Sequence, residues 1–168
     1  GDVYKRQTDT WTRTMSRDEH GVFVVTGDIP AMWLRDSSAQ LWPFLIMCDL
    51  PEVTRQIGDV IARQWHCIDV DPYANAFNSG PTGAHLDADD LDVADELWER
   101  KYEVDSLAFP VDLAWRYWQA TGSPEHLNGA VHQGCIRIID VWSLEQDHAR
   151  STYCLLYTSD AADERSSV

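Results

Sequence analysis

Apolar residues between Pro51 and Cys67 recur at steps of three and four positions, which is the repeat of one face of an α-helix. They are Val53, Ile57, Val60, Ile61 and Trp65. Pro51 suits the first turn of a helix, where a missing N–H breaks no hydrogen bond, and Glu52 complements the positive end of the helix dipole. We therefore predict an amphipathic helix over Pro51 to Cys67 with its apolar face in a core.

The segment before this helix, from Asp36 to Asp49, also carries apolar residues at helical spacing. It contains Pro43, which removes an internal hydrogen bond and clashes one turn back. We predict a helix with a kink at that proline.

Two more helices are predicted downstream. The first places Pro110 in its first turn and stops at Gly122, with an apolar stripe formed by Val111, Ala114, Trp115 and Trp118. The second runs from Glu125 to about Asp147, and Gly129 and Gly134 weaken the helical pattern of its first half.

One strand is predicted, over Val22 to Thr26, because this run is short and rich in β-branched residues. The rest of the pattern is helical and lacks the alternation of strands and helices that builds a parallel sheet. The expected fold class is therefore all-α, with a short β element near the N-terminus.

The chain of 168 residues has the length of one domain and a formal net charge of −15. Such a charge repels nucleic acids and anionic membranes, so neither is expected as a partner. The cysteines are few and form no C-x-x-C pair, which argues against a disulfide framework, and there is no apolar run of membrane-spanning length. A cytoplasmic location is expected.

Both ends of the chain differ in character from its middle. The residues DVYKRQ at 2–7 and CLLYTSDAADE at 154–164 resemble translated adaptor sequence, which is excluded from fold reasoning. We expect residues 8–153 to be the natural part of a single domain, with residues 1–7 and 154–168 as non-native tails.

The run TGDIPAMWLRDSSAQLWPF, from Thr26 to Phe44, gathers Trp33, Arg35 and Asp36 at the expected start of a helix. Carboxylates accept hydrogen bonds from hydroxyl pairs, a guanidinium donates to oxygens, and an indole covers C–H surfaces. These three residues are therefore candidates to bind a neutral sugar. The alternative is structural: Asp36 caps the helix, Arg35 pairs with it, and Trp33 belongs to the core.

The segment DPYANAFN, from Asp71 to Asn78, is too rich in polar and turn-forming residues for a regular element. We interpret it as a loop at the mouth of a pocket, where the amide of Asn78 both donates to and accepts from sugar hydroxyls. A loop in which asparagines merely hold turns is the other interpretation.

Glu103 and Asp105 lie among charges that precede the third helix. In an extended segment they would share a face, where they would bind hydroxyls or orient Arg35. Alternatively, they are ordinary charges at a helix N-terminus, with Asp105 or Ser106 as its cap.

The acidic run HLDADDLDVADE from His85 to Glu96 does not have the spacing of a metal site. Counted from Asp87 as the first position, the calcium loop requires glycine at the sixth position, where this chain has Asp92. We predict neither a metal nor any other cofactor.

Three segments in order resemble glycoside hydrolase family 125, the metal-independent exo-acting alpha-1,6-mannosidases. They are GDIPAMWLRDSSAQLWP, DPYANAFN and WERKYEVDSLAFPVDLAWRYWQATG. The resemblance implies an (α/α)6 toroid, of which this chain supplies the first part. It also implies a mannose-containing oligosaccharide as the partner, bound by Trp33, Arg35, Asp36, Asn78, Glu103 and Asp105.

The same resemblance implies an inverting reaction that uses an acid Asp and a base Glu. Both lie in family motifs that have no match before Tyr153, so the catalytic residues of this chain are unknown. Two other functions stay open: a catalytically silent carbohydrate-binding domain and a purely structural helical domain.

Overall fold

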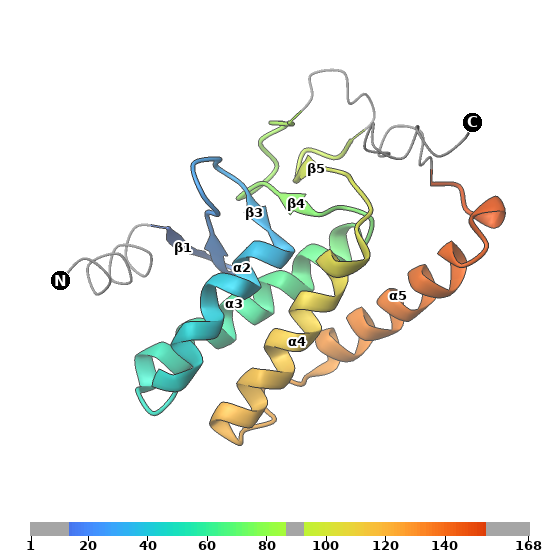
Figure 1. Cartoon of the computed structure of the whole chain (residues 1–168). Helices are drawn as coiled ribbons and strands as arrows, with labels where there is room; N and C mark the ends of the chain where they lie inside the picture. Colours follow the sequence, from blue (N-terminus) through green and yellow to red (C-terminus); the bar gives the residue numbers. More distant parts are fainter. Residues whose placement is uncertain (1–13, 87–92, 154–168) are drawn as a thin grey trace, which may run out of the picture.

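The computed structural model describes residues 14–86 and 93–153, and these residues are mostly helical. The helices are α2 (Leu34–Leu41), η1 (a 3₁₀ helix, Trp42–Met47), α3 (Pro51–Val70), α4 (Val104–Thr121), α5 (Gly129–Glu145) and η2 (a 3₁₀ helix, His148–Arg150). Helix α4 packs against α2 and α3, while α5 packs mainly against α3 (Figure 1). None of the described helices is both long and apolar enough to cross a membrane.

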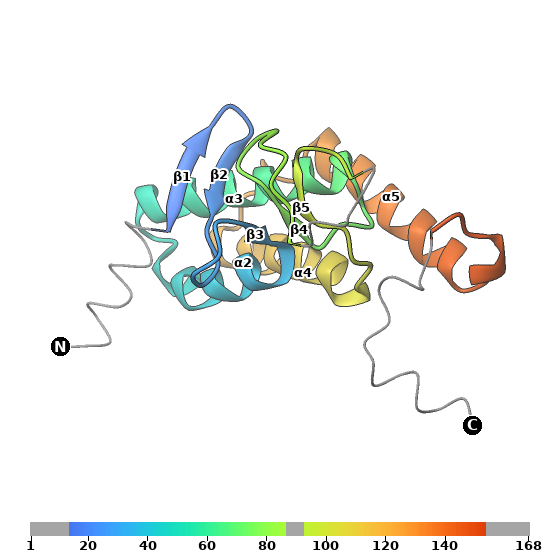
Figure 2. The same ribbon diagram turned by 90° about the horizontal axis from the view of Figure 1, so that it is seen from above.

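Two small antiparallel sheets accompany the helices. Strands β1 (Met15–Asp18) and β2 (Gly21–Val24) form a hairpin, and a second sheet has the order β3 (Met32–Trp33), β4 (Ala76–Phe77), β5 (Leu97–Glu99). The hairpin packs on α3, whereas the three-stranded sheet lies at the end of the helices where α2 and α4 begin (Figures 1 and 2). The sequence predicts a strand only near β2, because β3, β4 and β5 are too short to show a period and β1 contains no β-branched residue.

The helix predicted over Asp36 to Asp49, with a kink at Pro43, is instead two helices of different type that meet just before the proline. Helix α2 ends at Leu41, and the chain continues as the 3₁₀ helix η1, which contains the proline near its start. Helix α2 begins at Leu34, earlier than the predicted Asp36, with Trp33 as its extended N-terminal flank. Arg35 and Asp36 therefore both belong to the first helical turn.

Helix α3 begins at Pro51 as predicted and runs past Cys67 to Val70. Its buried Gln64 donates hydrogen bonds to the hydroxyls of Ser37 (2.8 Å) and Ser38 (2.9 Å). Both serines are fully buried, although the sequence indicates them only as residues of a helix start. This contact turns one face of α2 toward the core and leaves Arg35 and Asp36 partly exposed.

The structure corrects the prediction for α4, which begins at Val104, so that Pro110 lies inside the helix and not in its first turn. Proline removes one N–H from the ladder there, but its side chain is buried. Gly122 ends the helix in the left-handed conformation (φ 68°), as predicted.

The predicted stripe of α4 is not its buried face. Val111, Trp115 and Trp118 are 37%, 52% and 36% exposed, and only Ala114 of that stripe is buried. The helix instead buries Ser106, Leu107, Pro110, Leu113, Ala114 and Tyr117. Two apolar stripes overlap on this helix, and the contact with α2 and α3 selects one of them.

Helix α5 starts at Gly129, later than the predicted Glu125, because Asn128 caps it. The Asn128 side chain accepts hydrogen bonds from the main-chain N–H groups of Ala130 (2.9 Å) and Val131 (3.3 Å). Gly134 faces the indole of Trp65, where a Cβ atom would lie 2.4 Å from ring carbon Cε3. This glycine permits close helix packing rather than marking a break.

Candidate functional site

The three-stranded sheet brings the first turns of α2 and α4 to one end of the molecule. Strand β3 runs directly into α2, and β5 leads through residues 100–103 into α4. Asn75 joins the two paths: its carbonyl accepts from the N–H of Leu34 (3.1 Å), and its own N–H donates to the carbonyl of Glu99 (3.3 Å). Residues distant in sequence thereby meet at two neighbouring helix N-termini.

Arg35 lies between two carboxylates at this end. Its Nη1 donates to Oδ2 of Asp105 at 3.0 Å, and its Nε is 3.5 Å from Oδ2 of Asp36. The side chains of Arg35, Asp105 and Asp36 are 43%, 46% and 47% exposed, so solvent reaches all of them. The hydrogen bond to Asp105 raises the pKa of Arg35, against the effect of burial, and the charges of Asp36, Asp105 and Glu103 add to the increase.

Glu103 flanks the N-terminus of α4 beside this ion pair. One carboxylate oxygen accepts from the hydroxyl of Ser106 (3.0 Å), and the other is 3.7 Å from Nζ of Lys101. Glu103 is an extended residue that precedes α4, whereas Asp105 is in the first turn, so they do not share a strand face. Of the two, Asp105 is the one whose carboxylate accepts a hydrogen bond from Arg35. We call Arg35, Asp36, Glu103 and Asp105 the Arg35 cluster.

Trp33 enters the site from the sheet. It pairs with Ala76 of the central strand, which in turn pairs with Glu99. Residues directly opposite in an antiparallel sheet project from the same face, so Trp33 and Glu99 flank a small alanine. Trp33 is partly exposed and not part of the fully buried core.

Sequence reasoning missed Asn75 and Glu99. Asn75 is 2% exposed, and its Nδ2 donates to Oε2 of Glu99 at 2.5 Å. Their strands are two and three residues long. The one sequence signal for Glu99 is its position, four residues before Glu103 in the charged segment that leads into α4.

The described hydrogen bonds of the Asn78 side chain do not involve the Arg35 cluster. Asn78 is 3% exposed, and its Nδ2 is within 2.8, 2.9 and 3.1 Å of the carbonyl oxygens of Ala84, Asp95 and Leu97. The described contacts of its amide nitrogen therefore connect the segment after β4 to the start of β5.

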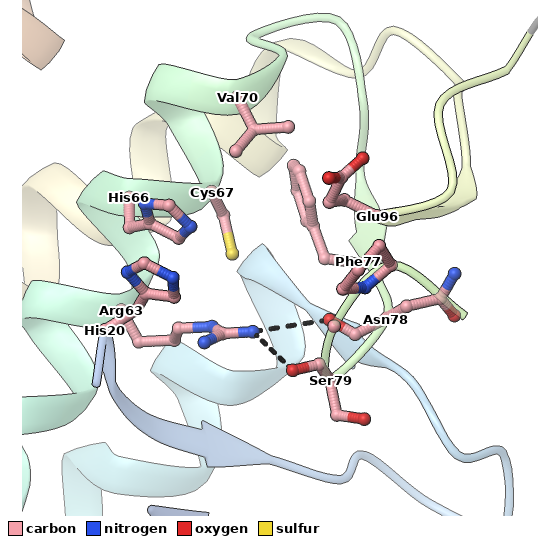
Figure 3. A pocket seen from close by; sticks show the side chains of 11 residues that line it. His20, Arg63, His66, Cys67, Val70, Phe77, Asn78, Ser79 and Glu96 are labelled. Atoms are coloured by element: carbon pink, nitrogen blue, oxygen red, sulfur yellow. Dashed lines mark hydrogen bonds between the residues drawn. The ribbon is translucent and has the colours of Figure 1, made fainter. Parts of the chain in front are cut away.

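Asn78 also lines a cavity of about 170 Å³ on the hairpin side of α3. Its other lining residues are His20, Arg63, His66, Cys67, Val70, Phe77, Ser79, Gly80, Pro81 and Glu96. Figure 3 shows the Arg63 guanidinium reaching the carbonyl oxygens of Asn78 (3.4 Å) and Ser79 (3.1 Å).

Arg63 also forms an ion pair with Asp18 of the hairpin (2.5 Å). The rings of His20 and His66 stack with centroids 3.8 Å apart. Burial lowers the pKa of His66, and the neighbouring His20 and Arg63 lower it further. These contacts tie the hairpin to α3 and to the segment after β4.

Within residues 14–86 and 93–153, no three potential ligands cluster as a metal site would require. His85 instead places Nδ1 2.8 Å from the carbonyl oxygen of Leu97. The middle of the acidic run, residues 87–92, lies outside the described residues.

Comparison with solved structures finds a close match. A metal-independent alpha-mannosidase from Streptococcus pneumoniae, solved in a non-productive complex with alpha-1,6-mannobiose, superposes with a TM-score of 0.85 at 41% identity. The match covers 90% of this chain and 37% of that one.

Among curated proteins, the meiotically up-regulated gene 157 protein of Schizosaccharomyces pombe is 37% identical over 126 residues. That alignment covers 67% of this chain and 24% of the yeast protein. The chain thus spans only about a quarter of that relative's length.

A sequence profile of the metal-independent alpha-mannosidases (GH125) matches residues 2–164, nearly the whole chain. The expected family is confirmed by this match and by the solved structure. The chain belongs to the GH125 family of metal-independent alpha-mannosidases.

Proposed function

We propose that this chain forms the part of an exo-acting alpha-mannosidase that grips the terminal mannose of alpha-1,6-linked mannosides. The observation that carries the proposal is the 3.0 Å ion pair between Arg35 and Asp105, which joins the first turns of two helices beside the sheet. Family membership and the mannobiose-bound relative from Streptococcus support it.

The chemistry of the Arg35 cluster suits an uncharged hexose. Asp36 and Asp105 are each about half exposed, so their carboxylates have free faces that can accept hydroxyl hydrogens. Arg35 is held between them and donates to ring or hydroxyl oxygens. Both carboxylates lie in the first turns of their helices, where a negative charge interacts favourably with the helix dipole.

Trp33 supplies the apolar surface of this site in our proposal, and Glu103 adds a third carboxylate. Trp33 is partly exposed, as a stacking platform for C–H groups requires. For Asn78 we propose a structural role, since its amide nitrogen is occupied by backbone carbonyls. The unpredicted Glu99 borders the site across Ala76.

We further propose that hydrolysis proceeds with inversion and without a metal, and that polypeptide beyond this chain supplies the acid and base. The chain covers 37% of the solved mannosidase, which leaves ample sequence for those groups. In an inverting site the two carboxyls stand about 6.5 to 9.5 Å apart to admit a water molecule. The complete (α/α)6 toroid is part of the same proposal.

The test is hydrolysis of alpha-1,6-mannobiose by the full-length protein, with and without a chelator. We expect mannose release that the chelator does not reduce, with the β-anomer appearing first in the NMR spectrum. Arg35→Ala should raise KM at least tenfold, whereas Arg137→Ala, which removes an exposed ion pair between α5 and α3, should leave it unchanged. Binding without hydrolysis would identify a silent carbohydrate-binding domain, and no binding of any alpha-mannoside would overturn the proposal.

A further inference from the structure

Three tyrosines gather at residues 100–103, where the chain passes from β5 into α4. The rings of Tyr73 and Tyr153 stack with centroids 4.7 Å apart, and Tyr102 lies 5.5 Å from Tyr73 and 6.1 Å from Tyr153. Tyr153 is 7% exposed. The three tyrosines connect three segments: Tyr73 follows α3, Tyr102 precedes α4, and Tyr153 follows α5.

The hydroxyl of Tyr153 holds the main chain of the α4 entry. It accepts a hydrogen bond from the N–H of Tyr102 (2.8 Å) and donates one to the carbonyl of Arg100 (3.4 Å). The Arg100 guanidinium lies 5.1 Å from the Tyr153 ring and forms a 2.6 Å ion pair with Asp71. One phenol thus fixes both sides of a short turn.

Glu145, at the end of α5, holds the three tyrosines in place through Tyr73. Its carboxylate is 6% exposed and accepts hydrogen bonds from the hydroxyls of Tyr73 (2.8 Å) and Ser151 (2.5 Å). It also lies 2.6 Å from Nδ1 of His148. Burial opposes ionisation, but the bonds from Ser151, His148 and Tyr73 together lower the pKa of Glu145. The carboxylate therefore stays charged and keeps Tyr73 in place.

The turn held in this way leads directly to the proposed sugar site. Glu103 directly follows Tyr102, whose N–H is bonded to Tyr153, and Asp105 lies in the first turn of α4. Lys101 lies between Arg100 and Tyr102. The main-chain N–H of Lys101 also donates to the side chain of Asn75 (3.3 Å). Any shift of the turn would carry the carboxylates of Glu103 and Asp105 with it.

We propose that Tyr153 and Glu145 are positioning residues for the mannoside site: they fix the turn over residues 100–103 and so aim Glu103 and Asp105 at the sugar beside Arg35. This inference rests on the proposed function. Neither residue belongs to the Arg35 cluster, so their effect reaches the ligand through the main chain. A displacement of less than an ångström suffices to weaken a polar contact of this kind.

Tyr153→Phe tests the inference, because it removes the hydroxyl and keeps the stacked ring. Tyr117→Phe is a matched control: Tyr117 is 8% exposed, and its hydroxyl donates to the carbonyl of Thr54 (3.0 Å), away from the turn. In the full-length protein we expect Tyr153→Phe to raise KM for alpha-1,6-mannobiose about threefold to tenfold with little change in kcat. Tyr117→Phe should lower Tm by about as much as Tyr153→Phe does, but leave KM unchanged.

A second measurement reads the turn itself. Hydrogen exchange at the amide of Tyr102 should become about tenfold faster or more in Tyr153→Phe and stay unchanged in Tyr117→Phe. Glu145→Gln should act in the same direction as Tyr153→Phe, since an amide reproduces only part of the acceptor set of the carboxylate.

Each outcome decides the inference. Equal KM values for Tyr153→Phe, Tyr117→Phe and the unaltered protein would overturn it, even if the Tyr102 amide exchanged faster. If the unaltered protein neither bound nor hydrolysed mannosides, the proposed function would fail. Faster exchange at Tyr102 in Tyr153→Phe would then show only that Tyr153 holds this segment. Failure of the positioning inference can therefore be told apart from failure of the proposed function.

Discussion

Gly134 of α5 lies so close to Trp65 of α3 that a Cβ atom would sit 2.4 Å from its ring. Gly134→Ala should therefore lower the free energy of unfolding by about 1–3 kcal/mol, although alanine favours helix. Gly129→Ala is the control, because a Cβ atom added at Gly129 would meet no heavy atom within 4 Å. Urea unfolding of both variants measures the difference, and equal stability of the two would contradict the packing described for α5.

Asp105→Asn separates ligand binding from stability at the Arg35 cluster. The ion pair with Arg35 is nearly half exposed, so we expect the free energy of unfolding to change by less than about 1 kcal/mol. The affinity for alpha-1,6-mannobiose should fall about tenfold, since an amide accepts more weakly than a carboxylate. Asp112→Asn disrupts an ion pair with Arg116 on the same helix and should leave affinity unchanged in titration calorimetry.

His66 makes stability depend on pH. Its pKa is lowered in the folded state, chiefly by burial, so the unfolded chain binds a proton more readily. Its contribution to stability is complete above the unfolded pKa of about 6.5 and is lost as pH falls below that value. His66→Gln should flatten this part of the curve in urea unfolding at several pH values. His132→Gln, at an exposed site on α5, should leave the curve unaltered.

The assignment of the buried face of α4 is tested by comparing two substitutions. Leu113 is 0% exposed, and Leu113→Ala should cost about 2–5 kcal/mol of unfolding free energy. Trp115 is 52% exposed, so Trp115→Gln should cost less than about 1 kcal/mol of unfolding free energy. Because it removes exposed apolar surface, it should also reduce aggregation, measured by light scattering. If Trp115→Gln lost more unfolding free energy than Leu113→Ala, the stripe predicted from sequence would be the buried face after all.

The helix with the long apolar repeat, an irregularity at Pro43 and the stop at Gly122 were predictable from the amino-acid sequence, because these features depend on local backbone chemistry. The sequence also indicated that Arg35, Asp36 and Asp105 stand at helix starts, where charged side chains are common. Its three ordered motifs pointed to the correct family.

The buried stripe of α4 became clear only in three dimensions, because the choice depends on the contact with α2 and α3. The small sheet could not be predicted, since strands of two or three residues gain stability from their partners and carry no period of their own. That sheet sets Arg35 beside Asp105 across 70 positions of sequence and leaves Asn78 among backbone carbonyls. Local sequence selects helix ends, whereas long-range pairing decides which of those ends meet.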